Sequence, residues 1–349
     1  MTRIVLLDDC DLSDAQIARL RRLGEVEVHT TAPAGAEEIR RRLSGAEVAV
    51  LGWTSLDAAL LRQLPELRMI SVWATGHDYV DVRAAARLGI TVTNVPAYAG
   101  SAVSELALGL MLALCRNIAR GSRRVRGGTL SWQGLGGTEL GGRTLGIIGV
   151  GDIGSRLAGL GTALGMRVLA YARNMSDERA GRLGVEFRPM PDLLREADFV
   201  SLHLPLTPGT HGLLGEKELS MMKPGAFLIN TARAALVDQD ALHDALANGR
   251  LAGAGLDDLD PERGDITALD NVVATPHIGF YTDTALARKG DICVGNVEAF
   301  LSGRAENVVA GPRGPGPDPF VGPAVGHSMG HSMGHSAGHS AGHSAGQGD

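Results

Sequence analysis

Three glycines at the end of a short strand are the first candidates for chemistry. The apolar run Leu145 to Val150 passes into Gly149-x-Gly151-x-x-Gly154, and the helix-like stretch SRLAGLGTALGM follows. Gly149 allows a tight turn, Gly151 lets the backbone approach a pyrophosphate, and Gly154 lets the helix pack against the strand. Free N–H groups at the helix N-terminus favour the anion. The spacing alone is a weak signal among 48 glycines, but its place between a strand and a helix predicts a dinucleotide site.

Two basic side chains follow predicted strands further along the chain. Arg233 comes directly after AFLINTA, and His277 comes shortly after NVVAT. Parallel α/β sheets bind ligands at the carboxyl ends of their strands. A guanidinium matches the two oxygens of a carboxylate, and an imidazole exchanges a proton near neutral pH. A surface ion pair for Arg233 and a purely structural hydrogen bond for His277 are the alternatives that the residues alone leave open.

Composition limits the class of protein. The chain has 349 residues, 44% of them hydrophobic, which predicts roughly two domains. Its net charge of −6 does not favour nucleic acid as a partner. No apolar stretch has the length of a membrane span and no signal peptide is recognisable, so we expect a cytoplasmic protein without a membrane partner. Cys10, Cys115 and Cys293 are few and far apart, which predicts reduced thiols.

Strand and helix patterns alternate along most of the chain. The first 95 residues contain short β-rich runs at 4–7, 25–30, 46–52, 67–74 and 90–95, with helical spacing between them. A long apolar helix is predicted from Ser101 to about Arg120, followed by an irregular Gly-rich segment at 121–142. The alternation resumes after Arg143 and ends with a helix over about 283–302. This order is typical of the α/β class with mostly parallel sheets.

The sequence resembles the D-isomer-specific 2-hydroxyacid dehydrogenase family from roughly residue 45 to residue 310. The motifs that carry the likeness stand in the family's order: ATGHDYVDVRAAARLGITVTN, VSELALGLMLAL, ELGGRTLGIIGVGDIG, LHLPLTPGTHGLL, MKPGAFLINTARAALVD, AGAGLDDLDPE and TPHIG. The resemblance implies two Rossmann-like or flavodoxin-like parallel-sheet domains with an interdomain cleft. Residues 1–97 and 282–311 would form the substrate-binding domain, and residues 98–281 the dinucleotide-binding domain. It also implies a homodimer.

The resemblance implies a hydride transfer between a nicotinamide dinucleotide and C2 of a small 2-oxo or 2-hydroxy acid. Arg233 would hold the substrate carboxylate and His277 would exchange the proton. Glu262 would pair with His277, orient its ring and raise its pKa; the alternative is an exposed loop glutamate. Asp257 would lie near the nicotinamide carboxamide, or else cap a loop. Asp258 stands where the family usually has an apolar residue.

Substrate contacts are implied for the backbone of Thr75 and Gly76, and Trp53 is placed either to line the pocket or to pack in the core. Arg263 is a second departure from the family pattern, because proline is common there. The cofactor contacts implied by the resemblance are Gly149, Gly151, Asp152, Ile153, Gly154, Ala172, Arg173, His203, Pro205, Thr231, Ala232 and Asp257.

Cofactor choice depends on the end of the second strand of the dinucleotide domain. NAD-specific proteins place an acid there to accept the ribose hydroxyls. This chain has Ala172 in that place and Arg173 after it, which favours NADP(H) and leaves NAD(H) possible if Arg173 faces solvent. The expected reaction is that of a glyoxylate or hydroxypyruvate reductase. The alternatives are an NAD-dependent dehydrogenase of a larger or phosphorylated acid, resembling phosphoglycerate dehydrogenase, and a dinucleotide-sensing corepressor.

The segment 312–349 differs from the rest of the chain. It is rich in Gly, Pro and His and has almost nothing to bury, so we expect disorder. No metal site is expected in the fold. Histidines at a spacing of four offer a weak, adaptable metal site or none at all; they are His327, His331, His335, His339 and His343.

Overall fold

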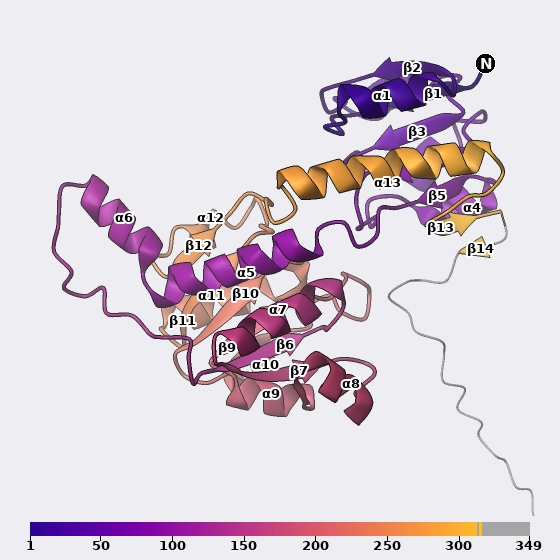
Figure 1. Ribbon diagram of the computed structural model, residues 1–349. Coiled ribbons are helices and arrows are strands. Elements are labelled where there is room, and N and C mark those ends of the chain that lie inside the picture. The colour runs from indigo at the N-terminus through magenta and orange to yellow at the C-terminus, as the bar shows by residue number, and fades with distance from the viewer. Residues whose placement is uncertain (313, 316–349) are drawn as a thin grey trace, which may run out of the picture. The chain divides into compact units, whose positions relative to one another are not determined.

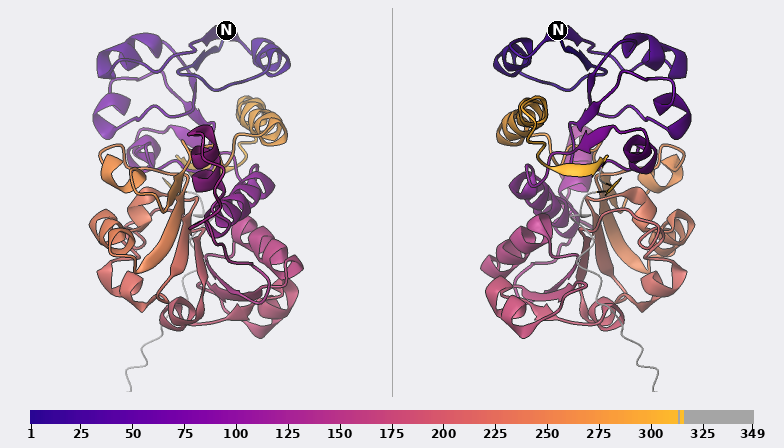
Figure 2. Two further views of the ribbon diagram at one scale, coloured as in Figure 1. Left: turned by 90° about the vertical axis from the view of Figure 1, so that its left-hand side faces the viewer. Right: turned by 90° about the vertical axis from the view of Figure 1, so that its right-hand side faces the viewer.

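The computed structural model describes residues 1–312, 314 and 315 and contains two seven-stranded sheets (Figures 1 and 2). The α/β class with two parallel-sheet domains is therefore confirmed. In this part of the chain no single helix is long and apolar enough to cross a membrane; only the helices Gly100–Cys115 and Ile118–Arg126, which are bent by 63° relative to each other, reach that length and hydropathy together.

The first sheet has the strand order β14-β13-β5-β4-β3-β1-β2. Strands β1 to β5 are parallel, and β13 runs antiparallel to β5. The order 2-1-3-4-5 is that of flavodoxin-like sheets. The strands are β1 (Arg3–Leu6), β2 (Glu25–Val28), β3 (Val48–Leu51), β4 (Met69–Val72), β5 (Thr91–Thr93), β13 (Val308–Gly311) and β14 (Gly314–Pro315); the helices are α1 (Asp14–Arg21), α2 (Ala36–Arg42), α3 (Ala58–Leu61), α4 (Val82–Arg87) and α13 (Asp283–Leu301).

The second sheet has the order β12-β11-β10-β9-β6-β7-β8, and all its strands are parallel. Its order reverses between β6 and β9, as in dinucleotide-binding Rossmann sheets. The strands are β6 (Thr144–Ile148), β7 (Arg167–Tyr171), β8 (Glu186–Phe187), β9 (Phe199–Leu202), β10 (Ala226–Asn230), β11 (Leu251–Leu256) and β12 (Val272–Ala274); the helices are α5 (Gly100–Cys115), α6 (Ile118–Arg126), α7 (Asp152–Ala163), α8 (Asp177–Leu183), α9 (Met190–Glu196), α10 (Glu216–Met221), η1 (Ala234–Leu236), α11 (Gln239–Ala247) and α12 (Gly264–Thr267).

Apolar side chains on both faces of the strands form the cores. The central strands β3, β4, β6 and β9 are buried along their whole length, as expected when helices cover both faces of a parallel sheet. The C-terminal segment returns to the first sheet: α13 packs against α1 and β4, and β13 pairs with β5. Cys10, Cys115 and Cys293 are buried and free.

The long helix predicted from Ser101 to about Arg120 is confirmed as far as Cys115 and is wrong in its last five residues. Helix α5 ends at Cys115, and Asn117 adopts a left-handed φ of 53°. Its amide nitrogen donates to the carbonyl of Gly136 at 3.0 Å, so the side chain stabilises the break. Helix α6 then starts at Ile118 in a new direction and continues to Arg126, inside a segment predicted to be irregular; Figure 1 shows it projecting beyond the end of α5.

Candidate active site

The glycine turn between β6 and α7 is shaped by close backbone contacts. A Cβ on Gly149, which has a φ of +98°, would lie 2.5 Å from the carbonyl oxygen of His203, and one on Gly154 would lie 2.0 Å from that of Gly149. Only glycine fits at either position. A Cβ on Gly151 would meet nothing within 4 Å, and no side chain caps α7 there. The turn therefore leaves open space at the N-terminus of a twelve-residue helix, where an anion is favoured.

Two buried polar atoms beside this turn have no partner in the described part of the chain. They are Nδ1 of His203 and Oγ1 of Thr231, which follow β9 and β10 at the same edge of the sheet. Burial lowers the pKa of His203 to about 4, so its imidazole is neutral at pH 7. Buried polar groups normally have hydrogen-bond partners, and a dinucleotide bound along this edge would supply them. Pro205 and Ala232 lie on the same two loops.

The end of β7 carries no acid. Ala172 is buried and Arg173 is exposed. A second arginine that the sequence analysis did not single out, Arg179 on α8, donates to the carbonyls of Val150 and Asn174 at 2.7 Å each. Its guanidinium therefore lies against the glycine turn. The only signal for it in the sequence is its position six residues after Arg173.

Asp152 and Ile153 were also expected at the cofactor. The carboxylate of Asp152 accepts from Nε of Arg156 at 2.9 Å, and Arg156 in turn reaches Ser101 on α5. Ile153 packs with the core that includes α13. Neither side chain extends over Gly151, so at these positions the backbone N–H groups are the available contacts.

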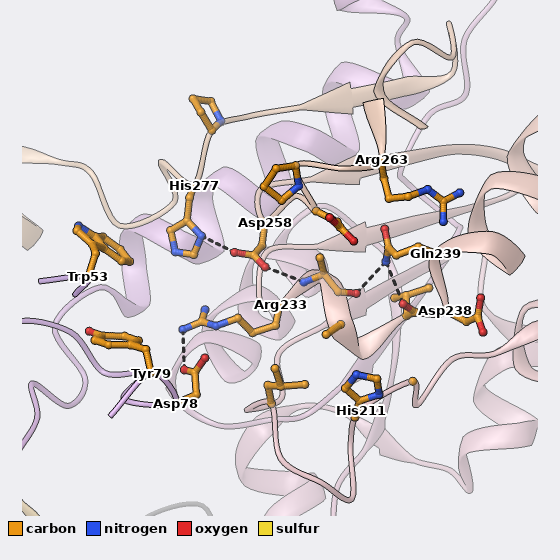
Figure 3. A pocket seen from close by; sticks show the side chains of 18 of the residues that line it. Trp53, Asp78, Tyr79, His211, Arg233, Asp238, Gln239, Asp258, Arg263 and His277 are labelled. Carbon is orange, nitrogen blue, oxygen red and sulfur yellow. Dashed lines mark hydrogen bonds and ion pairs between the residues drawn. The ribbon is translucent and has the colours of Figure 1, made fainter. Parts of the chain in front are cut away.

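A pocket of about 1150 Å³ lies at the carboxyl edge of the second sheet (Figure 3). Arg233 and His277 both line it, together with Trp53, Tyr79 and Tyr281. The structure thus brings together two basic residues 44 positions apart in sequence, and it adds Trp53 from the first sheet. Among the described residues, no cluster of three or more His, Cys, Asp or Glu side chains has a metal-binding arrangement.

Arg233 packs directly on the glycine of the predicted substrate loop. A Cβ on Gly76 would lie 2.2 Å from a terminal nitrogen of Arg233, so the guanidinium occupies the space that a side chain at position 76 would take. The guanidinium also donates to the carbonyl of Ala232 at 2.9 Å and lies 3.7 Å from Asp78. Thr75 turns its hydroxyl to the carbonyl of Val95 at 2.6 Å. The loop and the arginine therefore form one surface with donors available to a carboxylate.

His277 pairs with Asp258, and Glu262 lies elsewhere. Nδ1 of His277 is 2.7 Å from Oδ1 of Asp258 (Figure 3). Glu262 is exposed and does not line the pocket; among the described residues its one hydrogen bond is from its backbone N–H to the carboxylate of Asp260 at 3.0 Å. The structure therefore does not place Glu262 beside His277 as the family pattern implies. Nearby Arg263 binds Asp240 and Asp265 and holds the loop in this path.

Asp257 occupies the position of a loop cap. It is 3% exposed and accepts from the hydroxyl of Thr275 at 2.5 Å and from the N–H groups of Ile278 and Gly279 at 2.9 and 2.8 Å. Its oxygens are thus engaged by the turn that carries His277. Of the two functions considered for Asp257, this geometry matches the structural one.

Trp53 owes its position to a residue that the sequence analysis did not single out. Asp8 is 2% exposed, and its carboxylate accepts from the N–H groups of Gly52, Trp53 and Thr54 and from the Thr54 hydroxyl. Asp8 follows β1 and Trp53 follows β3, which is the point where the order of the first sheet reverses. Trp53 meets the His277 ring edge-on at 5.6 Å between centroids. In the sequence, the only indication of this function of Asp8 is its position directly after the first predicted strand.

Lys289 is a second residue near Trp53 that the sequence did not indicate. It is fully buried, and its Nζ has no hydrogen-bond partner in the described chain. The amine lies 3.3 Å from the ring centroid of Trp73 and 3.9 Å from that of Phe280. Phe280 in turn packs against His277, with 6.0 Å between the ring centroids.

The five tail histidines that were considered as a weak metal site lie outside the described residues.

A Rossmann sheet with an open glycine turn, together with a pocket that holds an arginine and a carboxylate-paired histidine, defines a dinucleotide-linked oxidoreductase. Residues 108–279 match the model of the D-isomer specific 2-hydroxyacid dehydrogenase NAD binding domain. A glyoxylate reductase of Thermococcus litoralis is 41% identical over 258 residues, covering 71% of this chain and 78% of the relative. A glycerate dehydrogenase of Methylorubrum extorquens is 39% identical, covering 88% and 99%.

Solved structures agree with these relatives. An acyclic imino acid reductase in complex with NADPH and D-Arg superposes with a TM-score of 0.82 at 31% identity, covering 88% of this chain and all of the other. The D-lactate dehydrogenase of Aquifex aeolicus, complexed with NAD and lactic acid, has a TM-score of 0.80 at 32% identity, covering 89% and 100%. The chain belongs to the D-isomer-specific 2-hydroxyacid dehydrogenase family, whose members transfer a hydride between a nicotinamide and a 2-hydroxy or 2-oxo acid.

Proposed function

We propose that this enzyme reduces a small 2-oxo acid of the glyoxylate or hydroxypyruvate type with NADPH. The observation that carries the proposal is the meeting of Arg233 and His277 in one pocket, in a chain whose second sheet also carries an open glycine turn. Relatives named glyoxylate reductase and glycerate dehydrogenase support the choice of acid.

Arg233 is the proposed clamp for the substrate carboxylate. The Arg233 side chain is 27% exposed and lines the pocket. A guanidinium can bind both oxygens of a carboxylate at once. Gly76 leaves it room. A substrate carboxylate that binds here competes with Asp78, whose contact at 3.7 Å is too long for a good hydrogen bond. The clamp fixes the acid so that C2 and its oxygen lie on the His277 side of the pocket.

His277 is the proposed proton donor. Reduction adds a hydride to C2 and a proton to the C2 oxygen, and the bound reduced nicotinamide supplies the hydride. Because Nδ1 of His277 faces Asp258 at 2.7 Å, Nε2 is the ring nitrogen left for the substrate oxygen. The rings of Trp53 and Phe280 pack against the imidazole, with their centroids 5.6 and 6.0 Å from that of His277. In the oxidation direction the same nitrogen takes the proton back.

The preference for NADPH rests on the end of β7. Ala172 offers no carboxylate to the ribose hydroxyls, and Arg173 and Arg179 follow it. Arg179 already lies against the glycine turn through Val150, so it provides a cation where the adenosine ribose meets that turn in Rossmann folds.

A homodimer built on α6 and the following loop is also proposed. Helix α6 buries none of its residues against the described part of the chain, and its apolar residues Ile118 and Val125 are more than half exposed. Leu130 and Trp132 on the next loop are 84% and 78% exposed. An apolar projection of this kind is typical of an interaction surface. Sedimentation of wild type against Trp132→Glu tests it: a monomeric wild type contradicts the dimer.

One assay tests the reaction. NADPH is mixed with a panel of 2-oxo acids of increasing size, and the loss of its near-ultraviolet absorbance is followed. We expect the fastest turnover with glyoxylate or hydroxypyruvate and slow turnover with phosphorylated acids. Binding of NADPH without turnover of any acid in the panel would contradict the proposed activity and would favour a sensor.

A further inference from the structure

Two consecutive aspartates at the end of β11 hold the turn that carries His277. His277 itself has a left-handed φ of 55°, which is uncommon for a residue with a side chain. Asp257 holds the backbone of this turn through Thr275, Ile278 and Gly279. Asp258 holds the ring. The backbone and the imidazole are thus fixed by adjacent residues of one strand end.

Asp258 also contacts the element that carries the carboxylate clamp. Its Oδ2 accepts from the backbone N–H of Ala234 at 2.8 Å, and Ala234 directly follows Arg233. Its side chain is 25% exposed. Burial alone would raise the pKa of Asp258, but the hydrogen bonds from His277 and Ala234 outweigh burial and lower it. The carboxylate is therefore ionised at neutral pH and bridges the proton donor and the clamp (Figure 3).

Glu262 is in no position to do the same. In the described chain its carboxylate makes no hydrogen bond or ion pair, and its side chain is exposed outside the pocket. The next residue, Arg263, is 19% exposed and is held by Asp240 at 2.8 Å and Asp265 at 2.9 Å. These contacts hold the loop in place, and Figure 3 shows Arg263 and His277 on opposite sides of Asp258. The Nδ1 position is already occupied by Asp258.

We propose that Asp258, and not Glu262, is the positioning carboxylate of His277 in this enzyme, which rests on the proposed function of His277 as proton donor. Asp258 accepts the Nδ1 proton and so directs Nε2 to the substrate. It stabilises the imidazolium that donates the proton. Through Ala234 it also fixes the distance between His277 and Arg233. Asp258 acts through His277 and does not touch the substrate.

The test compares Asp258→Asn, Asp258→Glu and the matched control Glu262→Gln. Asparagine keeps the size of the side chain but removes the charge, so we expect kcat to fall about 10²-fold, the scale of general acid–base catalysis, with a smaller change in KM. The pH at which kcat declines should move to lower values, because the charge that favours the imidazolium is lost. Asp258→Glu should recover part of kcat. Glu262→Gln should keep kcat within about twofold and leave the pH profile unchanged.

The charged groups around His277 are known for the pH profile. Asp258 contacts the ring, and Lys289 lies behind Trp53 and Phe280. The other charged or titratable side chains that line the pocket are Asp78, Tyr79, His211, Arg233, Asp238, Asp240, Asp260, Arg263 and Tyr281. Among the groups that line the pocket the variants change Asp258 alone, because Glu262 does not line it. Thermal unfolding and NADPH affinity of each variant should stay near wild type, which separates positioning from a folding defect.

A second readout does not depend on turnover. NMR of isotope-labelled histidine reports which ring nitrogen carries the proton. In wild type and Glu262→Gln we expect the Nδ1–H form of His277 when the ring is neutral, and in Asp258→Asn a mixture of both forms. If no acid is reduced but the tautomer depends on Asp258, the proposed activity fails and the positioning stands. A loss of kcat in Glu262→Gln with an unaffected Asp258→Asn overturns the proposal.

Discussion

The two turns that border the site are held by different means. The glycine turn at the end of β6 is held by backbone against backbone, because a Cβ on Gly149 or Gly154 would lie only 2.5 or 2.0 Å from a carbonyl oxygen. The turn around His277 is held by side chains, through the carboxylates of Asp257 and Asp258. A turn of the first kind requires one residue type at fixed positions. A turn of the second kind requires a carboxylate within reach, which different positions along the loop can supply.

The largest expected effect comes from His277. His277→Ala should lower kcat about 10² to 10⁴-fold, because the proton donor at the C2 oxygen is lost. His243→Ala is the matched control, since His243 lies outside the pocket on α11 beside Asp244 and should leave kcat unchanged. Steady-state kinetics with the best 2-oxo acid decides. A wild-type rate in His277→Ala would show that another group moves the proton.

The glycine turn gives the next effect, and it separates fold from ligand binding. In Gly154→Ala the new Cβ would lie 2.0 Å from a backbone oxygen, so the turn must shift, at a cost of about 1–3 kcal/mol in unfolding free energy. In Gly151→Ala the Cβ enters open space, so stability should be kept while NADPH affinity falls. Denaturant unfolding and NADPH titration of both variants test this. Equal affinities for NADPH in wild type and Gly151→Ala would show that the dinucleotide does not approach this residue.

This contrast explains which parts could be predicted from the sequence. The alternation of strands and helices and the Gly149 to Gly154 turn follow from local periodicity and backbone sterics, which neighbouring residues determine. The pairing of His277 depends on a loop path that Arg263, Asp240 and Asp265 fix through contacts distant in sequence. Residue spacing carries no information about that path, so Glu262 was selected by its position in a motif.

Residues that act through burial were also hard to predict. Asp8 holds the backbone of Trp53 from the end of another strand. Lys289 is the single lysine of α13, and a lone lysine in a helix gives no sign that it is buried. The break at Asn117 was missed because an apolar helix pattern continues into Ile118, whereas the left-handed residue between them is set by a contact to Gly136. In each case the partner that decides the structure is far away in the sequence.

Cofactor choice is the third test. Like the pairing of His277, it depends on side chains at the end of a strand, here β7. A positioned arginine can meet the 2′-phosphate with charge-assisted bonds of roughly 1.5–3 kcal/mol, or about ten- to a hundredfold in affinity. Wild type should prefer NADPH, and Ala172→Asp with Arg173→Ala should reverse the order. The comparison is kcat/KM for each cofactor at fixed ionic strength. Arg179→Ala alone should reduce the preference, whereas a wild-type preference for NADH would contradict the assignment.

Lys289 gives the smallest expected effect on activity and a measurable one on stability. Burial lowers the pKa of Lys289 to about 7, although Cys10, Cys293 and Asp11 act in the opposite direction. The unfolded chain keeps a lysine pKa near 10.4, so it binds more protons than the folded chain between about pH 7 and pH 10. Stability therefore rises with pH across this window, and the cost of the buried cation is fully present below it.

Replacing Lys289 by methionine should remove that cost while filling the same space. We expect Lys289→Met to unfold with a free energy on the order of 2 kcal/mol higher at pH 6, since the faces of Trp73 and Phe280 already offset part of the penalty in wild type. The difference should shrink toward pH 10, because the folded amine is neutral there and removing the proton from the unfolded amine costs little near its own pKa of about 10.4. Denaturant unfolding at a series of pH values measures it, and kcat should change little because Lys289 does not line the pocket. A variant that is less stable than wild type at pH 6 would show that the contacts of the cation with the rings of Trp73 and Phe280 stabilise the fold by more than burial of the charge costs. The rings behind His277 would then be held by a charged side chain, as the turn that carries His277 is held by Asp257 and Asp258.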